Sequence, residues 1–233
     1  MIELKLLTDF PQEIIAIDEV GRSPLSGPVV IGGVRLRIEH FEDLATLVRS
    51  LRRQKVKDSK LLTHEARVQI LEKLNIPTLP FREQGNFQWK GIEISFVTWE
   101  MEHMVIDQEN ILQASLRGMK EVAQHLCQSN GKDTTVLIDG HMKLKWPDSS
   151  PLWKEIPIIK GDVKSPLIGL AAIIAKEKRD AWMREMHVSY PHYGFDTNFG
   201  YPTRAHRMAI ELHGPCPIHR KSFNKVKEFL PSE

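Results

Sequence analysis

Short apolar runs alternate with amphipathic stretches along most of the chain, and the two patterns predict different elements. A nearly continuous apolar run of four to eight residues is typical of a strand buried on both faces. Apolar residues spaced three or four apart are typical of a helix that covers a sheet. The predicted strands are 13–18, 29–36, 91–97, 135–139 and 156–159. The predicted helices are 41–54, one following Thr63, 107–128, one opened by Ser165-Pro166, and 203–212. This interleaving predicts an α/β fold with a mixed sheet.

Composition narrows the class of protein. The chain has 233 residues, 41% hydrophobic, with 32 basic against 30 acidic side chains and a net charge of +2. Such a chain is typical of a soluble globular protein that can bury an ample core in one large domain. No apolar stretch reaches the length that spans a bilayer, and the N-terminus does not resemble a signal peptide. Two cysteines, Cys127 and Cys216, fit a reducing compartment, so we expect a cytoplasmic protein.

Acidic residues stand where three of the predicted strands end. Asp18 and Glu19 follow the first strand, Asp139 ends another, and Asp162 follows the last. Acids beside buried strands are costly unless they are paired or bind a metal ion. If they converge, their oxygens suit Mg²⁺ or Mn²⁺, and such ions can assist a phosphoryl displacement. The alternative is that Asp139 belongs to an Asp-Gly turn and that Asp162 caps a helix.

Three other segments could carry chemistry. The turn at 21–28 contains glycines that allow close approach to a ligand, although it could equally be a plain hairpin connection. A basic run at 49–60 is a candidate phosphate-tracking surface or simply a solvated helix face. His213, Cys216 and His219 have spacing that suggests zinc, but no fourth ligand is evident nearby, which disfavours that site.

The motifs, taken in order, resemble those of bacterial ribonuclease HII. The match begins with AIDEVGRSPLSGPVV at 16–30 and covers nearly the whole chain, from residue 14 to about 223. The later motifs are KDSK at 57–60, NILQA at 110–114, VLIDG at 136–140, IKGD at 159–162, AK and RD at 175–180, YPHYGF at 190–195, GYPT at 200–203, and GPCPIHRKSF at 214–223.

The resemblance implies a ribonuclease H-like fold, with a mixed central sheet, helices on both faces and a small helical C-terminal extension. It implies an endonuclease that hydrolyses RNA in RNA–DNA hybrids and at single ribonucleotides in duplex DNA. The cut would fall 5′ of the ribonucleotide, leave 5′-phosphate and 3′-hydroxyl ends, and serve the removal of misincorporated ribonucleotides. The domain would span 1–214, with a tail at 215–233 packing on or near the substrate cleft. We expect a monomer with no membrane partner.

The resemblance also implies roles for individual residues. The catalytic, metal-binding acids would be Asp18, Glu19, Asp139 and Asp162, holding Mn²⁺ or Mg²⁺. The turn would read the 2′-hydroxyl, and a tyrosine would pack on the next sugar. The substrate-binding residues would be Gly21, Arg22, Ser23 and Tyr201, with Lys60, Ser165 and Arg179 as phosphate-side partners.

Four departures from the family pattern concern substrate preference and leave the acids intact. Ser23 replaces the second glycine of the turn, Asn198-Phe199 replaces His-Lys, and Ala172 replaces a serine. Two alternatives therefore stay open. One is a nucleic-acid-binding protein without activity, which the four acids disfavour because they would repel phosphate. The other is a metal-dependent nuclease or phosphotransferase of the same fold with weakened ribonucleotide-junction specificity.

Overall fold

The central feature of the computed structural model is a six-stranded mixed sheet with the order β3-β4-β2-β1-β5-β6. The structure describes residues 1–56, 61–128, 133–144, 146 and 153–230. The strands are β1 (Gln12–Val20), β2 (Val29–Ile38), β3 (Gly85–Trp89), β4 (Ile92–Met101), β5 (Thr134–Asp139) and β6 (Lys154–Ile158). Strand β1 is antiparallel to β2 and parallel to β5, which is in turn parallel to β6. The predicted α/β class with a mixed sheet is confirmed.

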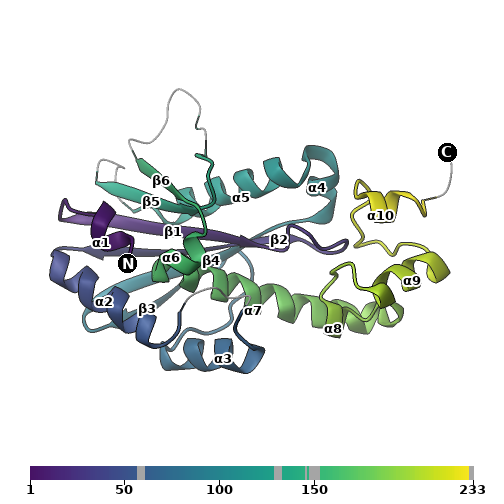
Figure 1. The fold of residues 1–233 in the computed structure, drawn as a ribbon, viewed down its shortest axis with the longest axis horizontal. Coiled ribbons are helices and arrows are strands. Elements are labelled where there is room, and N and C mark those ends of the chain that lie inside the picture. The colour runs from purple at the N-terminus through teal and green to yellow at the C-terminus, as the bar shows by residue number, and fades with distance from the viewer. Residues whose placement is uncertain (57–60, 129–132, 145, 147–152, 231–233) are drawn as a thin grey trace.

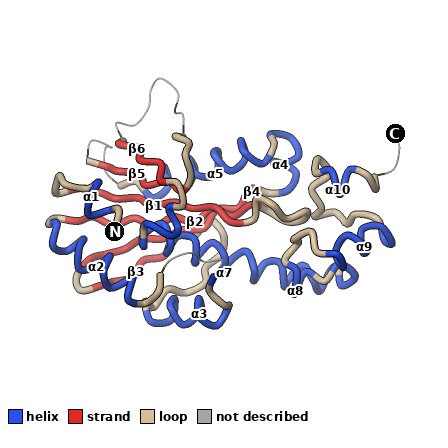
Figure 2. Tube along the Cα trace, viewed as in Figure 1, coloured by secondary structure: helices blue, strands red, loops and turns tan. Residues whose placement is uncertain are grey.

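Helices cover both faces of this sheet (Figure 1). Helix α5 packs on β2 and β4, with α4 beside it, while α7 crosses β1 and β2 on the opposite face, where α2 and α3 also lie. Figure 2 shows the strands as one layer between these helices. The helices are α1 (Glu3–Leu6), α2 (Phe41–Arg53), α3 (His64–Lys73), α4 (His103–Glu109), α5 (Ile111–Leu126), α6 (Gly161–Lys164), α7 (Pro166–Ser189), α8 (Phe195–Asn198), α9 (Arg204–His213) and α10 (Asn224–Lys227).

Strand β1 supplies apolar side chains to two separate cores. Ile14 and Ala16 pack into the core on the α2 and α7 side. Ile15 and Ile17 pack into the core on the α5 side, and all four side chains are fully buried. Successive side chains of a strand point to opposite faces, so a strand between two helical layers must be apolar at every position. Burial on both faces explains why β1 contains a continuous apolar run in the sequence.

Two elements differ from the sequence prediction. The helix predicted over 107–128 is two helices, because Asn110 adopts a left-handed φ of 72° between α4 and α5. Its side chain caps α5 by accepting hydrogen bonds from the N–H groups of Leu112 and Gln113 at 3.0 and 3.1 Å. Strand β3 was not predicted, because it is a five-residue edge strand, GNFQW, without a continuous apolar run.

The C-terminal elements gather at the far end of the long helix α7 (Figure 1). A third apolar cluster forms there, in which Phe195, Ile210 and Val226 pack with Met183 of α7. The residues after Gly214 are therefore anchored by their own core contacts. Among the described residues, no helix is long and apolar enough to cross a membrane.

Candidate metal centre and the adjoining turn

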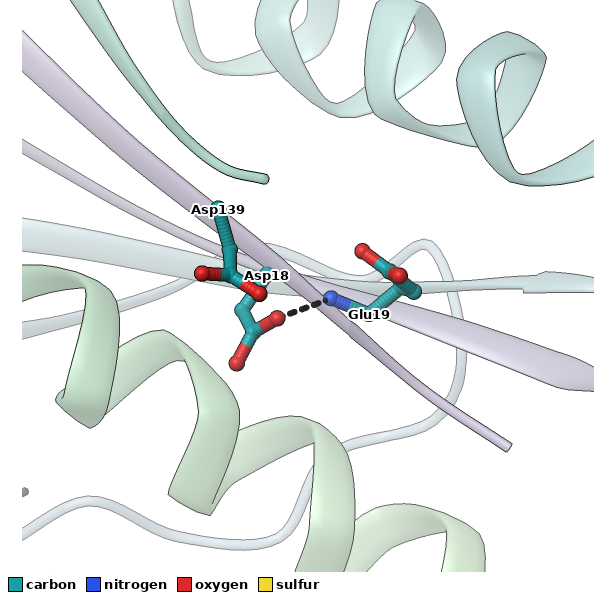
Figure 3. Close-up of side chains that lie close together, drawn as sticks. All are labelled: Asp18, Glu19 and Asp139. Carbon is teal, nitrogen blue, oxygen red and sulfur yellow. Dashed lines mark hydrogen bonds between the residues drawn. The ribbon is translucent and has the colours of Figure 1, made fainter. Parts of the chain in front are cut away.

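Three acidic side chains meet at one edge of the sheet. Strand β1 carries Asp18 and Glu19 near its end, and the parallel register pairs Ile17 with Ile138, which brings Asp139 alongside. Figure 3 shows the three side chains at these neighbouring strands. One ligand oxygen from each of Asp18, Glu19 and Asp139 lies within 4.8 Å of the others. In the part of the chain that the structure describes, this is the one group of three or more metal-ligating side chains so close together.

Backbone N–H groups orient two of these carboxylates. Asp18 Oδ1 accepts a hydrogen bond of 2.7 Å from the N–H of Glu19. Asp139 Oδ1 accepts one of 2.6 Å from the N–H of Gly161, at the start of α6. Because the main chain holds these oxygens, the acids are placed before any ligand arrives.

The fourth predicted acid, Asp162, lies beside this group and not within it. It stands in the first turn of α6, beyond the end of β6, and its Oδ1 accepts a hydrogen bond of 3.0 Å from the N–H of Val163. Asp162 therefore belongs to the first turn of α6 and is not its N-cap, which is Lys160. Asp162 is nevertheless buried, and its charge acts on Asp18.

The electrostatics of the cluster favour a bound cation. Asp18 is only 5% exposed. Burial raises its carboxyl pKa well above the usual range, and repulsion from Glu19, Asp139 and Asp162 raises it further. A divalent cation would reverse that repulsion, and an all-carboxylate set of oxygen donors suits Mg²⁺ or Mn²⁺. The residues present therefore fit such an ion.

A turn at residues 21–28 follows the acids directly. The guanidinium of Arg22 pairs with Glu19 at 3.2 Å, which ties the turn to the acidic cluster. Arg22 and Ser23 are exposed, whereas Gly21 is buried with φ 94°. A Cβ on Gly21 would stand 2.3 Å from Arg179 Nε, so only glycine fits there. Ser23 does not have a positive φ, so its side chain does not strain the backbone.

The structure gives Arg179, which we expected on the phosphate side, a place inside the fold. Its side chain is fully buried. It donates hydrogen bonds to the carbonyl oxygens of Ser26, Pro28 and Phe199 at 3.0, 3.0 and 2.9 Å. A guanidinium committed in this way holds the backbone of the turn and does not face a phosphate.

The other predicted substrate residues have separate outcomes. Ser165 is fully buried and caps α7 by accepting a hydrogen bond of 3.2 Å from the N–H of Ile168. Its expected phosphate contact stays a prediction. Lys60 lies outside the described residues. Tyr201 is half-buried, and its ring centroid lies 5.9 Å from Lys176 Nζ.

The residues that suggested zinc separate into two places. His213 stacks on His192 at the surface, with ring centroids 4.5 Å apart. Cys216 and His219 are buried and bonded to each other, with Sγ and Nδ1 3.1 Å apart. Burial raises the thiol pKa of Cys216 to about 11 and, with the neighbouring His206, lowers the pKa of His219 to about 3. A thiol held in its protonated form is a poor zinc ligand.

Sequence reasoning missed Arg220, which is fully buried and donates to the turn from the C-terminal segment. The only signals were its place in the GPCPIHRKSF motif and in a short basic pair.

Part of the basic run lines a pocket. Arg52 and Lys55, at the end of α2, share it with Lys164 of α6. Lys55 adopts a left-handed φ of 62°, a conformation in which glycine is the usual residue. Lys164 stands two residues after Asp162 in the same short helix.

Comparisons with known proteins agree with this geometry. The family model described as Ribonuclease HII matches residues 15–226. The ribonuclease HII of Desulfotalea psychrophila is 35% identical over 218 residues, covering 93% of this chain and 83% of that protein. The crystal structure of ribonuclease H2 from Pyrococcus horikoshii has a TM-score of 0.62 at 20% identity, covering 93% and 96% of the two chains. Bst-RNase HIII in complex with Mn²⁺ has a TM-score of 0.57 at 14% identity, covering 94% and 69%.

Proposed function

This chain belongs to the ribonuclease HII family, whose members are endonucleases acting on RNA–DNA hybrids, and from that premise we propose a finer activity. The enzyme cuts duplex DNA on the 5′ side of a single embedded ribonucleotide and leaves 5′-phosphate and 3′-hydroxyl ends. The observation that carries the proposal is the ion pair between Arg22 and Glu19. It joins the turn that would recognise the sugar to the acids that would act on its phosphate.

The acidic cluster would form the catalytic centre. Asp18, Glu19 and Asp139 would hold divalent cations, and Asp162 would complete the set from α6. Such ions, when bound, supply Lewis-acid stabilisation of the charge that develops during phosphate displacement. The acids themselves keep fixed positions, because backbone N–H groups already hold Asp18 and Asp139. We propose Mg²⁺ or Mn²⁺, supported by the hard oxygen donors and by the Mn²⁺ bound to Bst-RNase HIII.

The turn and Tyr201 would distinguish ribose from deoxyribose in the substrate. Backbone groups of Gly21, Arg22 and Ser23 would contact the 2′-hydroxyl, the group that distinguishes RNA from DNA. The ring of Tyr201 would pack on the next sugar, where a second 2′-hydroxyl would crowd it. The carbonyl of Tyr201 accepts a hydrogen bond of 2.9 Å from His206 Nδ1, which helps to fix the backbone that carries this ring.

The departures at 198 and 199 leave positive charge in place. The ring of Phe199 lies under two cations, with Lys176 Nζ and Arg184 Cζ at 4.9 and 5.4 Å from its centroid. Asn198 donates to the carbonyl of Tyr193 at 2.6 Å and so stabilises this loop. These contacts support junction cleavage by this chain despite the substitutions.

One experiment separates the proposal from a nuclease without sugar preference. The protein is incubated with Mg²⁺ or Mn²⁺ and three labelled duplexes: DNA with one ribonucleotide, all-DNA, and a long RNA–DNA hybrid. We expect a single cut 5′ of the ribonucleotide, abolished in Asp18→Asn and Asp139→Asn. The matched control Glu39→Gln changes an exposed carboxylate that pairs with Arg37 and should keep full activity. Equal cutting of all-DNA would overturn the proposal.

The same assay tests the proposed role of Tyr201. Tyr201→Ala should slow cutting at the single ribonucleotide more than it weakens metal binding, and unchanged junction cleavage would contradict the sugar contact. That the protein acts as a monomer stays a prediction from the sequence. A cytoplasmic location stays a prediction from the sequence.

A further inference from the structure

Arg220 holds the turn from beneath. This fully buried side chain donates four hydrogen bonds, all to carbonyl oxygens of the turn. The acceptors are Gly21 at 2.6 Å, Arg22 at 3.0 Å, Pro24 at 2.8 Å and Gly27 at 2.9 Å. One guanidinium therefore fixes the direction of four peptide groups.

The carbonyls of Gly21 and Arg22 matter most, because each shares a rigid peptide plane with the next N–H. In a trans peptide the C=O and N–H groups point in opposite directions. Drawing the carbonyl of Gly21 toward Arg220 therefore turns the N–H of Arg22 away from it, and the carbonyl of Arg22 does the same for the N–H of Ser23. Both residues are exposed. Among the described residues, neither N–H has a hydrogen-bond acceptor.

The segment that carries Arg220 is itself held against the turn. The N–H of Arg220 donates to the carbonyl of Leu25 at 2.8 Å, and the N–H of Gly27 donates to the carbonyl of Ile218 at 2.9 Å. These bonds run in both directions between the two segments. The guanidinium therefore starts from a fixed backbone and is not free to follow the turn if the turn moves.

A second anchor ties this segment to α4. The carboxylate of Asp107 accepts hydrogen bonds from the N–H groups of Lys221 and Ser222 at 3.0 and 2.8 Å. Asp107 belongs to α4, which packs against α5. The segment that carries Arg220 is therefore fixed relative to the helices on this face of the sheet.

The placement of Arg220 is costly, and packing alone does not account for it. Among the residues that the structure describes, Arg220 forms no ion pair with a carboxylate. Burial, with repulsion from Arg179, lowers its pKa well below the usual value. By contrast, the buried Arg35 has a carboxylate partner, Glu13, at 2.8 Å. The Phe223 ring, 5.1 Å from Arg220 Cζ, and the charge of Asp107 offset part of this cost. A buried cation whose hydrogen bonds all go to carbonyl oxygens is still expensive, which favours a role in holding those carbonyls.

We propose that Arg220 is a positioning residue for ribonucleotide recognition, and that it aims the N–H groups of Arg22 and Ser23 at the 2′-hydroxyl of the substrate. This inference rests on the proposed function. It also explains how serine can replace glycine at position 23. Arg220 sets the direction of the Ser23 N–H, so that direction does not depend on the backbone flexibility that glycine would provide. Arg220 touches no substrate and acts through the turn.

The test measures sugar preference in binding, separately from cleavage. Asp139→Asn serves as a non-cutting parent, and fluorescence anisotropy gives its Kd for a duplex with one ribonucleotide and for the all-DNA duplex. Adding Arg220→Lys keeps the charge but cannot span four carbonyls. We expect the preference for the ribonucleotide duplex to fall about tenfold, the equivalent of removing one or two hydrogen bonds. Affinity for all-DNA should stay within about twofold, since phosphate contacts set it.

Arg35→Lys in the same parent is the matched control. It weakens another buried arginine, near the opposite end of β1, and should cost stability while keeping the preference. An unchanged preference in the Arg220→Lys protein, or an equal loss of affinity for both duplexes, would overturn the inference. A parent with no preference would instead overturn the proposed sugar reading, and the inference with it.

A second measurement needs no change at Arg220. In the Asp139→Asn parent, the amide NMR signals of Arg22 and Ser23 should shift when the ribonucleotide duplex is added and stay in place with all-DNA. Identical shifts with both duplexes would contradict our proposal that these N–H groups point at the 2′-hydroxyl.

Discussion

The carboxylate of Asp139 and the backbone N–H of Gly161 are joined by a hydrogen bond of 2.6 Å. This contact links the end of β5 to the first residue of α6, the short helix that carries Asp162. A Cβ on Gly161 would stand 3.0 Å from Asp139 Oδ1 and 2.7 Å from Ile168 Cδ1. The space beside this carboxylate is therefore reserved for a residue without a side chain.

Replacing Gly161 by alanine should weaken metal use. The added methyl group displaces Asp139 or the start of α6, so we expect the Mg²⁺ concentration for half-maximal cleavage to rise about tenfold. A Mg²⁺ titration of junction cleavage measures this. Gly91→Ala controls for lost stability alone, because its Cβ would meet nothing within 4 Å although a φ of 86° strains the backbone there. An unchanged titration for Gly161→Ala would show that the close approach of Gly161 does not orient Asp139.

Asp18→Asn should raise the Tm of the metal-free protein. The carboxyl pKa of Asp18 is raised in the folded state, so the stability it contributes is present at acid pH and is lost as pH rises through that pKa. The amide has no such loss, and each kcal/mol recovered is worth about 2–4 °C for a chain of this size. Thermal melts in chelator at pH 5 and pH 7 measure this, with the larger difference expected at pH 7.

A divalent cation should reverse the order of the two melting temperatures, so that the unaltered protein melts higher than Asp18→Asn. Mn²⁺ binds the folded acids and should raise the Tm of the unaltered protein more than that of Asp18→Asn. If Mn²⁺ raises both melting temperatures equally, Asp18 is not a ligand.

Stability should fall between about pH 6.5 and pH 3 because of His219. Burial lowers its folded pKa to about 3, whereas the unfolded chain takes up the proton near pH 6.5. The unfolded state therefore binds one more proton within this window, and stability rises with pH there. Urea unfolding at several pH values measures the slope, which should be shallower in His219→Gln. A slope that stays the same in this variant would exclude His219 as its source.

The basic pocket should appear in the salt dependence of binding. Arg52 and Lys55 line it with Lys164, and removing one cation that binds a phosphate should lower the slope of log Kd against log salt by about 0.9. Arg52→Ala with Lys55→Ala should thus lower the slope by nearly two units if both residues bind phosphates. Arg53→Ala is a neighbouring control that does not line the pocket. The same decrease per residue in the control would indicate only general attraction by α2.

The acidic cluster could be predicted from the sequence because its causes are local. The apolar run before Asp18 marks a buried strand, and parallel strands bring their carboxyl ends to one edge. The helix that Ser165-Pro166 opens was predicted correctly for the same local reason, because the serine caps it and proline takes its first position.

Arg179 and Arg220 could not be predicted in this way. A hydropathy pattern treats arginine as a surface residue, and nothing in the sequence shows that a guanidinium will meet carbonyls far along the chain. Their acceptors are backbone atoms, so the identity of the partner residues gives no signal either. A pairing of this kind becomes visible only when the chain is folded.

The bond from Arg220 to Gly21 spans 199 residues, and this separation affects how the enzyme is assembled. Closing so long a loop is entropically costly, so such contacts tend to form late in folding. Synthesis proceeds from the N-terminus, and the acids of β1 and β5 are made well before Arg220. A nascent chain can therefore form its acidic cluster before Arg220 has bonded to the turn at residues 21–28. If Arg220 positions the turn as we propose, selectivity for the sugar would be acquired last, once the C-terminal segment has docked.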